Sequence, residues 1–123
     1  MIQILSVSDI KQREMLCQKA GLEDNDDLRV IAIHDEKGMV CEGAIFKYQG
    51  ENGTILWLDM GSDIELADGL GRAILSIMDI RGVKKVRLPL EYETLAHKMR
   101  FKRMDDHFEL SLEGFFCCGC QHK

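Results

Sequence analysis

Residues 59–90 hold the pattern that most restricts how this chain can fold. A strand ends in a polar turn, and the turn opens through Gly69-Leu70-Gly71 onto the longest helical pattern in the sequence. We expect that helix from about Glu65 or Ala67 to Arg81. Gly82 ends it, and residues 83–88 form a second apolar strand before Pro89. The buried face of the helix repeats at helical spacing, through Leu70, Ala73, Ile74, Ile77 and Met78. This stretch predicts a strand–loop–helix–strand unit with two glycines at the helix entrance.

The helix entrance in this unit is a candidate anion site. The first N–H groups of a helix have no intrahelical acceptor and lie at the positive end of the helix dipole, so they can bind a phosphate. Arg72 could add a bidentate contact to the same anion, or it could be an exposed helix residue. For Gly69 and Gly71, the alternatives to anion binding are close packing of the helix onto a sheet, or loop geometry alone.

The residues before this unit predict a strand, a helix and a meander of three strands. The helix begins at Ser8-Asp9, where Asp9 and Gln12 have capping-box spacing, and it ends at Gly21. Asn52-Gly53 is the strongest hairpin signal, and Gly43 inside a strand suggests a bulge or a close backbone approach. The expected strands are residues 2–7, 29–33, 39–48 and 54–60.

The residues after the unit predict one more helix and a closing β region. A helix begins near Glu91 and runs to about Arg100, residues 101–104 begin the last β region, and residues 107–113 alternate polar and apolar. The whole order predicts an α/β (α+β) chain with a mixed, mostly antiparallel sheet and helices on both faces. We expect a single domain over residues 1–114 and a Cys-rich C-terminal tail over residues 115–123.

This order, with a Gly-x-Gly before the central helix, resembles the GNAT (Gcn5-related N-acetyltransferase) superfamily. In that family the central helix begins with a Gln/Arg-x-x-Gly-x-Gly/Ala loop whose amides hold the pyrophosphate of acyl-CoA; the matching window here is residues 66–71. The family's Leu-Tyr-x-Lys-x-Gly-Phe pattern corresponds to residues 95–101. The resemblance implies acetyl-CoA as co-substrate, with cofactor contacts at Met60, Asp68, Gly69, Leu70, Gly71 and Arg72.

The chain departs from the family pattern at four positions. Leu66 replaces the loop's Gln or Arg, and Asp68 puts a negative charge where the pyrophosphate should lie. Ala96 stands where the family often has a tyrosine acid, and Arg100 replaces the glycine. These departures weaken the inference to catalysis more than the inference to fold.

Acyl transfer from a thioester to an amine needs a base for the amine proton and a donor for the leaving thiolate. Asp59, at the end of the strand before the loop, is the best-placed carboxylate, and Glu91 and Glu93 are second candidates. Each of these could instead be a solvated or helix-capping acid. Tyr92 is a weak substitute for the missing acid tyrosine.

Composition restricts the partners. The net charge of −5 disfavours nucleic acid and anionic membranes, and no apolar run approaches the length of about 18 residues that spans a bilayer. The N-terminus has no signal-peptide pattern, so we expect a cytoplasmic protein that acts on a small-molecule or peptide amine. A homodimer is compatible with the sequence, which does not fix the oligomeric state.

The C-terminal tail carries Cys117, Cys118, Cys120 and His122. These are ligand types that zinc prefers, but four ligands within six residues cannot easily enclose one ion, so we expect no metal and keep zinc as a minor alternative. The leading hypothesis is an acyl-CoA-dependent N-acyltransferase. The alternatives are a catalytically degenerate GNAT-like domain that binds a ligand or a protein, and a metal- or redox-responsive tail.

Overall fold

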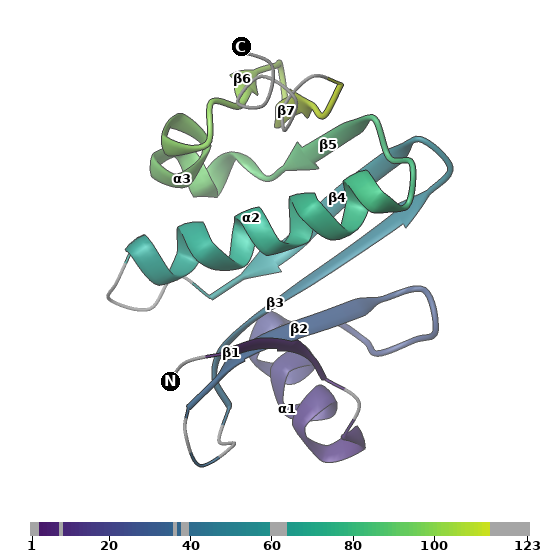
Figure 1. Cartoon of the computed structure of the whole chain (residues 1–123), viewed down its shortest axis with the longest axis vertical. Coiled ribbons are helices and arrows are strands. Elements are labelled where there is room, and N and C mark those ends of the chain that lie inside the picture. The colour runs from purple at the N-terminus through teal and green to yellow at the C-terminus, as the bar shows by residue number, and fades with distance from the viewer. Residues whose placement is uncertain (1–2, 8, 36, 38–39, 60–63, 114–123) are drawn as a thin grey trace, which may run out of the picture.

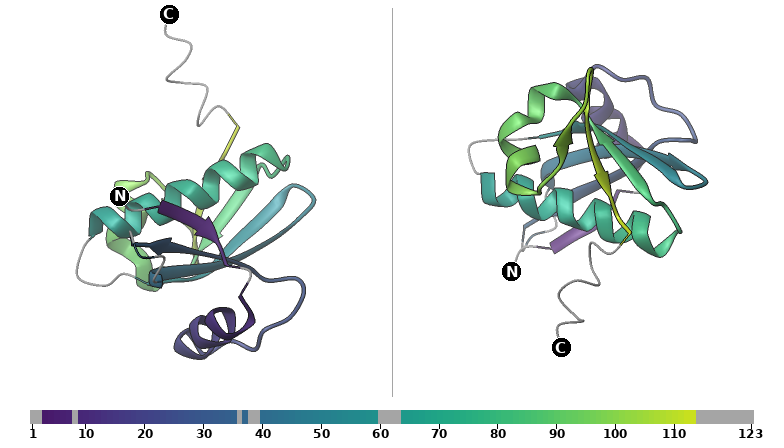
Figure 2. Two further views of the ribbon diagram at one scale, coloured as in Figure 1. Left: turned by 60° about the horizontal axis from the view of Figure 1, so that its bottom comes forward. Right: turned by 90° about the horizontal axis from the view of Figure 1, so that it is seen from above.

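The structure is a computed structural model that describes residues 3–7, 9–35, 37, 40–59 and 64–113. One mixed sheet runs through it in the order β1-β2-β3-β4-β5-β7-β6, and helices lie on both of its faces (Figures 1 and 2). This confirms the fold class expected from the sequence. The tail at residues 115–123, with the cysteines weighed as zinc ligands, lies outside the described residues.

The first half of the chain contains β1 and α1 and then a three-stranded meander. Neighbouring strands from β1 to β4 are all antiparallel. The bounds of these elements are β1 Gln3–Ser6, α1 Ile10–Ala20, β2 Arg29–His34, β3 Val40–Gln49 and β4 Asn52–Leu58.

The second half begins with a crossover. The long helix α2 carries the chain from β4 to β5, which pairs parallel to β4, and the remaining strand pairs are antiparallel. The bounds are α2 Ile64–Ile80, β5 Lys85–Leu88, η1 Leu90–Tyr92, α3 Glu93–Lys98, β6 Lys102–Arg103 and β7 Phe108–Ser111.

Strand β2 shows how side-chain alternation builds the two layers of the core. Ile31 and Ile33 face the larger cluster under α2, whereas Val30 and Ala32 face the smaller cluster under α1. A strand buried on both faces is apolar throughout, which is the continuous apolar run that the sequence shows here. Figure 2 shows α1 and α2 on opposite sides of this sheet.

Two glycine predictions for the first half are confirmed. Gly21 ends α1 in the left-handed conformation at φ 72°, and the Asp9 side chain accepts a hydrogen bond from the Gln12 N–H at the other end of the helix. A Cβ on Gly43 would lie 2.9 Å from Leu16 Cδ1, so this glycine lets α1 approach β3 closely.

The hairpin turn between β3 and β4 lies earlier than predicted. Gln49 pairs with Asn52, so the loop is Gly50-Glu51, and Gly50 has the positive φ of 60°. Gly53 is a strand residue, and a Cβ there would lie 2.6 Å from Met78 Sδ. Gly53 therefore allows β4 to pack closely against Met78 of α2. The residues next to Gly53 in the sequence do not reveal this role.

Candidate functional site

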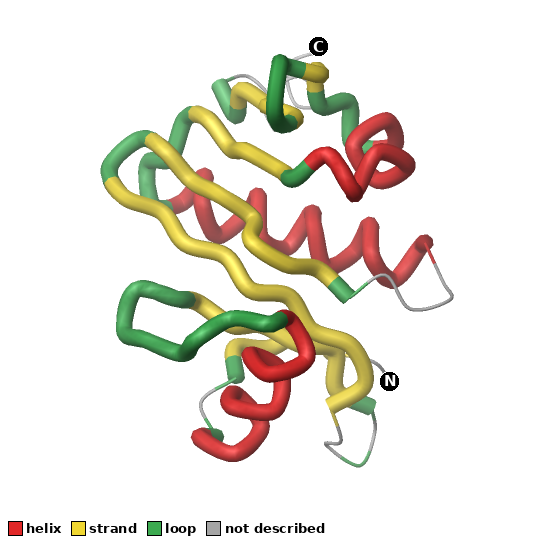
Figure 3. The backbone as a smooth tube through the Cα atoms, turned by 180° about the vertical axis from the view of Figure 1, so that it is seen from behind, coloured by secondary structure: helices red, strands yellow, loops and turns green. Residues whose placement is uncertain are grey.

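Strands β4 and β5 start together and then separate. They pair only from Asn52–Thr54 to Lys85–Arg87, although β4 continues to Leu58 (Figures 1 and 3). On the other side of β4, Ile55 and Trp57 face consecutive residues of β3, so Leu56 is an extra, bulged residue. Among the described residues, the β5-facing edge of β4 therefore has no strand partner over its last four residues.

Tyr92 lies beside the C-terminal end of β4, the part of that strand that does not pair with β5. The Leu58 N–H donates a hydrogen bond of 2.9 Å to the Tyr92 hydroxyl oxygen, and Tyr92 is only 5% exposed. Burial raises the pKa of Tyr92, the bond from the Leu58 amide lowers it, and the charges of Glu91 and Asp59 raise it further. The phenol is therefore neutral at pH 7 and keeps its proton for donation.

Asp59 follows Leu58 and is held by the first helix. Its Oδ2 lies 2.7 Å from Lys19 Nζ, and the Asp59 side chain is 11% exposed while that of Lys19 is 56% exposed. This ion pair joins the end of α1 to the end of β4, a contact that spans forty residues of sequence. Glu91 is exposed beside Tyr92, so Asp59, Glu91 and Tyr92 lie together at the end of β4. Glu93, the third predicted carboxylate, is exposed at the start of α3, where its Oε2 lies 3.6 Å from His97 Nε2.

The predicted Gly-x-Gly loop is helical, which corrects its expected position. Helix α2 begins at Ile64, so Gly69, Leu70 and Gly71 lie in its second and third turns. Their N–H groups point along the helix toward carbonyls four residues earlier, and the N–H groups without an intrahelical acceptor belong to residues 64–67. Helix α2 thus begins close to the start near Glu65 or Ala67 that the sequence predicts, and only the expected place of the glycines at its entrance is corrected, because they lie inside the helix.

Packing explains why residues 70 and 71 are leucine and glycine, but it does not require a glycine at position 69. A Cβ on Gly71 would lie 2.8 Å from Met99 Sδ, whereas the nearest atom to a Cβ on Gly69 is Ile4 Cδ1 at 3.8 Å. Leu70 is fully buried in the core. At Gly71 the observed role is thus the close-packing alternative, here against the segment that follows α3.

The charges near the start of α2 are paired within the protein. Asp68 Oδ2 lies 2.9 Å from Arg72 Nε, and Glu65 Oε1 lies 3.1 Å from Lys98 Nζ. Asp68 Oδ1 is buried and has no hydrogen-bond partner among the described residues. Met60, the remaining predicted cofactor contact, lies outside the described residues.

The described part of the chain contains neither a metal-ligand cluster nor a membrane-spanning helix. Residues 3–7, 9–35, 37, 40–59 and 64–113 contain no group of three His, Cys, Asp or Glu side chains that could hold a metal ion. None of the helices within those ranges has the length and apolar character needed to cross a bilayer.

Comparison with known proteins identifies the fold. No protein-family model matches the chain, and no curated protein matches it. Among solved structures, a proposed GNAT-family acetyltransferase from Desulfovibrio desulfuricans is 8% identical with a TM-score of 0.71, over 91% of this chain and 99% of that chain. A variant of the spermidine N-acetyltransferase SpeG from Vibrio cholerae is 9% identical with a TM-score of 0.67, over 96% and 98%.

A third structure carries a ligand. The proposed N-acetyltransferase YhhK from E. coli, bound to coenzyme A, is 15% identical with a TM-score of 0.65, over 90% of this chain and 98% of that chain. The sheet order, the parallel β4–β5 crossover and the helices on both faces are thus those of GNAT acetyltransferases. The chain has the GNAT fold.

Proposed function

We propose that this protein is an acyl-CoA-dependent N-acyltransferase that acetylates an amine at the open end of β4 and β5. The observation that carries the proposal is the separation of the two strands with Tyr92, Asp59 and Glu91 gathered at its mouth. The GNAT fold supports it, and YhhK offers an example of this fold with coenzyme A bound.

The residues at this end of the sheet fit acyl-CoA in part. Beyond Thr54, the backbone N–H and C=O groups on the β5-facing edge of β4 do not pair with β5. These groups can form hydrogen bonds with the amides of an extended pantetheine chain. The N–H groups of residues 64–67 suit a phosphate, and Lys98 adds a cation beside them. Gly69 and Gly71 do not fit the role that the resemblance implied, because their amides lie inside the helix.

Tyr92 is the proton donor in the proposed reaction. Bound acyl-CoA supplies the acyl group as a thioester, and the sulfur needs a proton as the bond to carbon breaks. The Leu58 N–H holds the Tyr92 phenol at the strand end through its oxygen, so the phenolic proton is free to be donated. Tyr92 lies one helical turn before Ala96, where the family often has its acid tyrosine.

Asp59 is the proposed base for the amine. Its carboxylate lies at the end of β4 and affects the pKa of Tyr92, so the two groups lie close together. Lys19 Nζ, 2.7 Å from Asp59 Oδ2, holds the carboxylate at the end of β4. Glu91, exposed at the mouth, is a second carboxylate that favours a cationic amine.

The alternative is a GNAT-fold domain that binds a ligand or a protein without acyl transfer. The helical Gly-x-Gly segment favours it, because Gly69 and Gly71 lie inside α2 and not in a loop before it. The two functions differ in one result, since a degenerate domain binds acetyl-CoA or a partner without forming acetylated product.

The test combines binding and turnover. Acetyl-CoA at 100 times its Kd should add about 2.7 kcal/mol to the unfolding free energy. Mass spectrometry then follows acetylation of a panel of amines, including spermidine and peptide N-termini. Tyr92→Phe should lower kcat by roughly 10²–10⁴-fold, the usual contribution of a general acid, and leave KM nearly unchanged. The control Thr94→Val removes an exposed hydroxyl from α3, the helix that follows Tyr92, and should leave kcat unaltered.

Two outcomes would oppose the proposal. The absence of any stabilisation by millimolar acetyl-CoA would exclude the site, and binding without product across the amine panel would leave the degenerate-domain alternative. Equal loss of kcat in Tyr92→Phe and Thr94→Val would show that Tyr92 is not the acid.

A further inference from the structure

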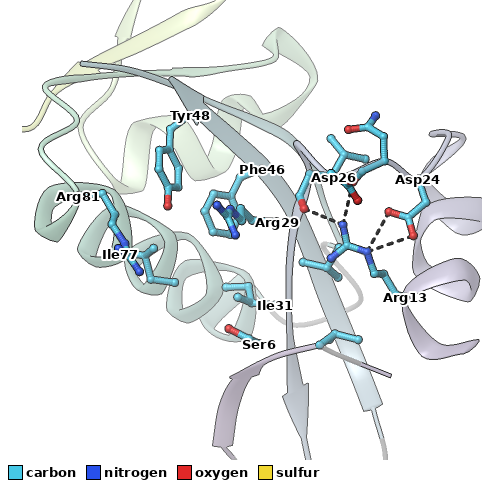
Figure 4. Close-up of a pocket in the computed structure, with 14 residues that line it drawn as sticks. Ser6, Arg13, Asp24, Asp26, Arg29, Ile31, Phe46, Tyr48, Ile77 and Arg81 are labelled. Atoms are coloured by element: carbon cyan, nitrogen blue, oxygen red, sulfur yellow. Dashed lines mark hydrogen bonds and ion pairs between the residues drawn. The ribbon is translucent and has the colours of Figure 1, made fainter. Parts of the chain in front are cut away.

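A cavity lies on the β2 side of the sheet, away from Tyr92. It has a volume of about 540 Å³ and lies between the start of β2, the end of β3 and the C-terminal end of α2 (Figure 4). Tyr48, on its wall, pairs with Gly53 near the start of β4, whereas Leu58 ends that strand. Five strand residues separate these two levels, roughly 16 Å. Ile31, at the other end of the wall, pairs with Ala44 and so reaches the level of Leu58 from the β2 side. The cavity is distinct from the proposed acyl-transfer site because none of Asp59, Glu91 and Tyr92 lines it.

The charges around this cavity are divided between two sides. On one side, Arg13 Nε binds Asp24 at 2.9 Å, and its Nη2 donates to the carbonyl oxygens of Asn25 and Leu28. Asp26 lies near this cluster in Figure 4. Arg13 is thus occupied in holding the loop after α1, and the acids of the cavity gather around it.

The other side carries two arginines. Arg29 starts β2 and Arg81 directly follows α2, and both are exposed and line the cavity. Within the described ranges, neither guanidinium forms an ion pair with an acidic side chain. The chain brings these two cations to one cavity although they are fifty-two positions apart in a sequence of net charge −5.

An aromatic platform lies beside the two arginines. The Arg29 guanidinium lies over the Tyr48 ring at 5.6 Å from its centroid, and the Tyr48 and Phe46 rings stack at 6.4 Å with an interplanar angle of 24°. Stacking on a ring orients a guanidinium while leaving its N–H groups available for a planar oxyanion. Ile77 adds an apolar wall from α2.

We propose that this cavity binds a small organic oxyanion, a carboxylate or phosphate monoester with an apolar or aromatic body. Arg29 and Arg81 bind the oxyanion, Tyr48 and Ile77 contact the body, and the buried Phe46 ring supports Tyr48 from behind. The two guanidiniums, which have no acidic partner among the described residues, suit the oxyanion of such a ligand, and the aromatic and aliphatic wall suits its apolar body. The site does not depend on acyl transfer, so it stands or fails separately from the proposed function.

The test titrates four probes into the full chain and follows backbone amides by NMR. Phenyl phosphate and benzoate combine an oxyanion with a ring, inorganic phosphate lacks the ring, and benzyl alcohol lacks the charge. We expect saturable shifts at the Arg29, Tyr48 and Arg81 amides with the first two probes. Inorganic phosphate and benzyl alcohol should bind at least several-fold more weakly. Added salt should weaken binding.

Variants separate this site from general charge effects. Arg29→Gln and Arg81→Gln should each weaken phenyl phosphate at least tenfold, roughly the loss of one charge-assisted hydrogen bond. The control Arg87→Gln removes the same charge from the exposed face of β5 and should change affinity by less than about twofold. All three positions are exposed, and retained amide spectra confirm folding. Unsaturable shifts at millimolar probe, or equal weakening in Arg87→Gln, would overturn the proposal.

Discussion

Replacing Gly69 and Gly71 by alanine, one at a time, tests whether the Gly-x-Gly segment is helical in solution. In a helix interior, alanine is favoured over glycine by about 1 kcal/mol. At Gly69 the new Cβ meets only Ile4 Cδ1 at 3.8 Å, an ordinary van der Waals contact. The Gly69→Ala variant should therefore be more stable than the wild type by about 0.5–1 kcal/mol.

Gly71→Ala should behave differently because its surroundings are full. The new Cβ would lie 2.8 Å from Met99 Sδ and 3.0 Å from Met99 Cε, and Met99 is itself buried. Overpacking of a core costs about 1–3 kcal/mol, which offsets or exceeds the helix-propensity gain. The two variants should thus differ in unfolding free energy by about 1–3 kcal/mol, with Gly71→Ala the less stable.

Urea denaturation measures this difference, with an unchanged m-value showing that both variants unfold from the same compact state. Acetyl-CoA affinity provides a second readout, since Gly69→Ala should leave it unchanged if the amides of residues 64–67 hold the pyrophosphate. A destabilised Gly69→Ala variant, or the same stability change at both positions, would refute the placement of these glycines inside α2.

Two further predictions concern pH and buried side chains. Tyr92→Phe leaves the buried Leu58 N–H without its acceptor and should cost about 1–3 kcal/mol at neutral pH. Because burial raises the folded-state pKa of Tyr92 above 10.0, the stability that it contributes is complete below pH 10 and is lost at higher pH. The gap between wild type and Tyr92→Phe in urea melts should therefore narrow above pH 10, and a widening gap would contradict this sign. Burial likewise raises the pKa of the Cys17 thiol from 9.0. The wild type should therefore lose stability relative to Cys17→Ala as the pH rises above 9. Parallel profiles of unfolding free energy against pH for the two proteins would contradict this prediction.

Local patterns predicted the fold well because each pattern has one structural solution. The i, i+3, i+4 spacing in α2 and the apolar run of β2 leave little choice of element or buried face. Gly21 was predicted correctly because a left-handed helix end strongly prefers glycine. Short connections then made the first strands an antiparallel meander.

The site was harder to predict because its geometry depends on contacts between distant segments. Glycine has several uses, and only the position of Met99 shows that Gly71 serves packing. The Lys19–Asp59 ion pair and the bond from Leu58 to Tyr92 join residues that are forty and thirty-four positions apart. The sequence placed Asp59, Glu91 and Tyr92 near strand ends, but it could not show that Tyr92 reaches β4.

The most direct test of the proposed function is an NMR titration of the full chain with acetyl-CoA. The account predicts saturable shifts at the amides of Leu58, Tyr92 and residues 64–67, with the Arg29 and Tyr48 amides unchanged. Shifts confined to other surfaces, or no shifts at millimolar acetyl-CoA, would contradict an acyl-CoA site between β4 and β5.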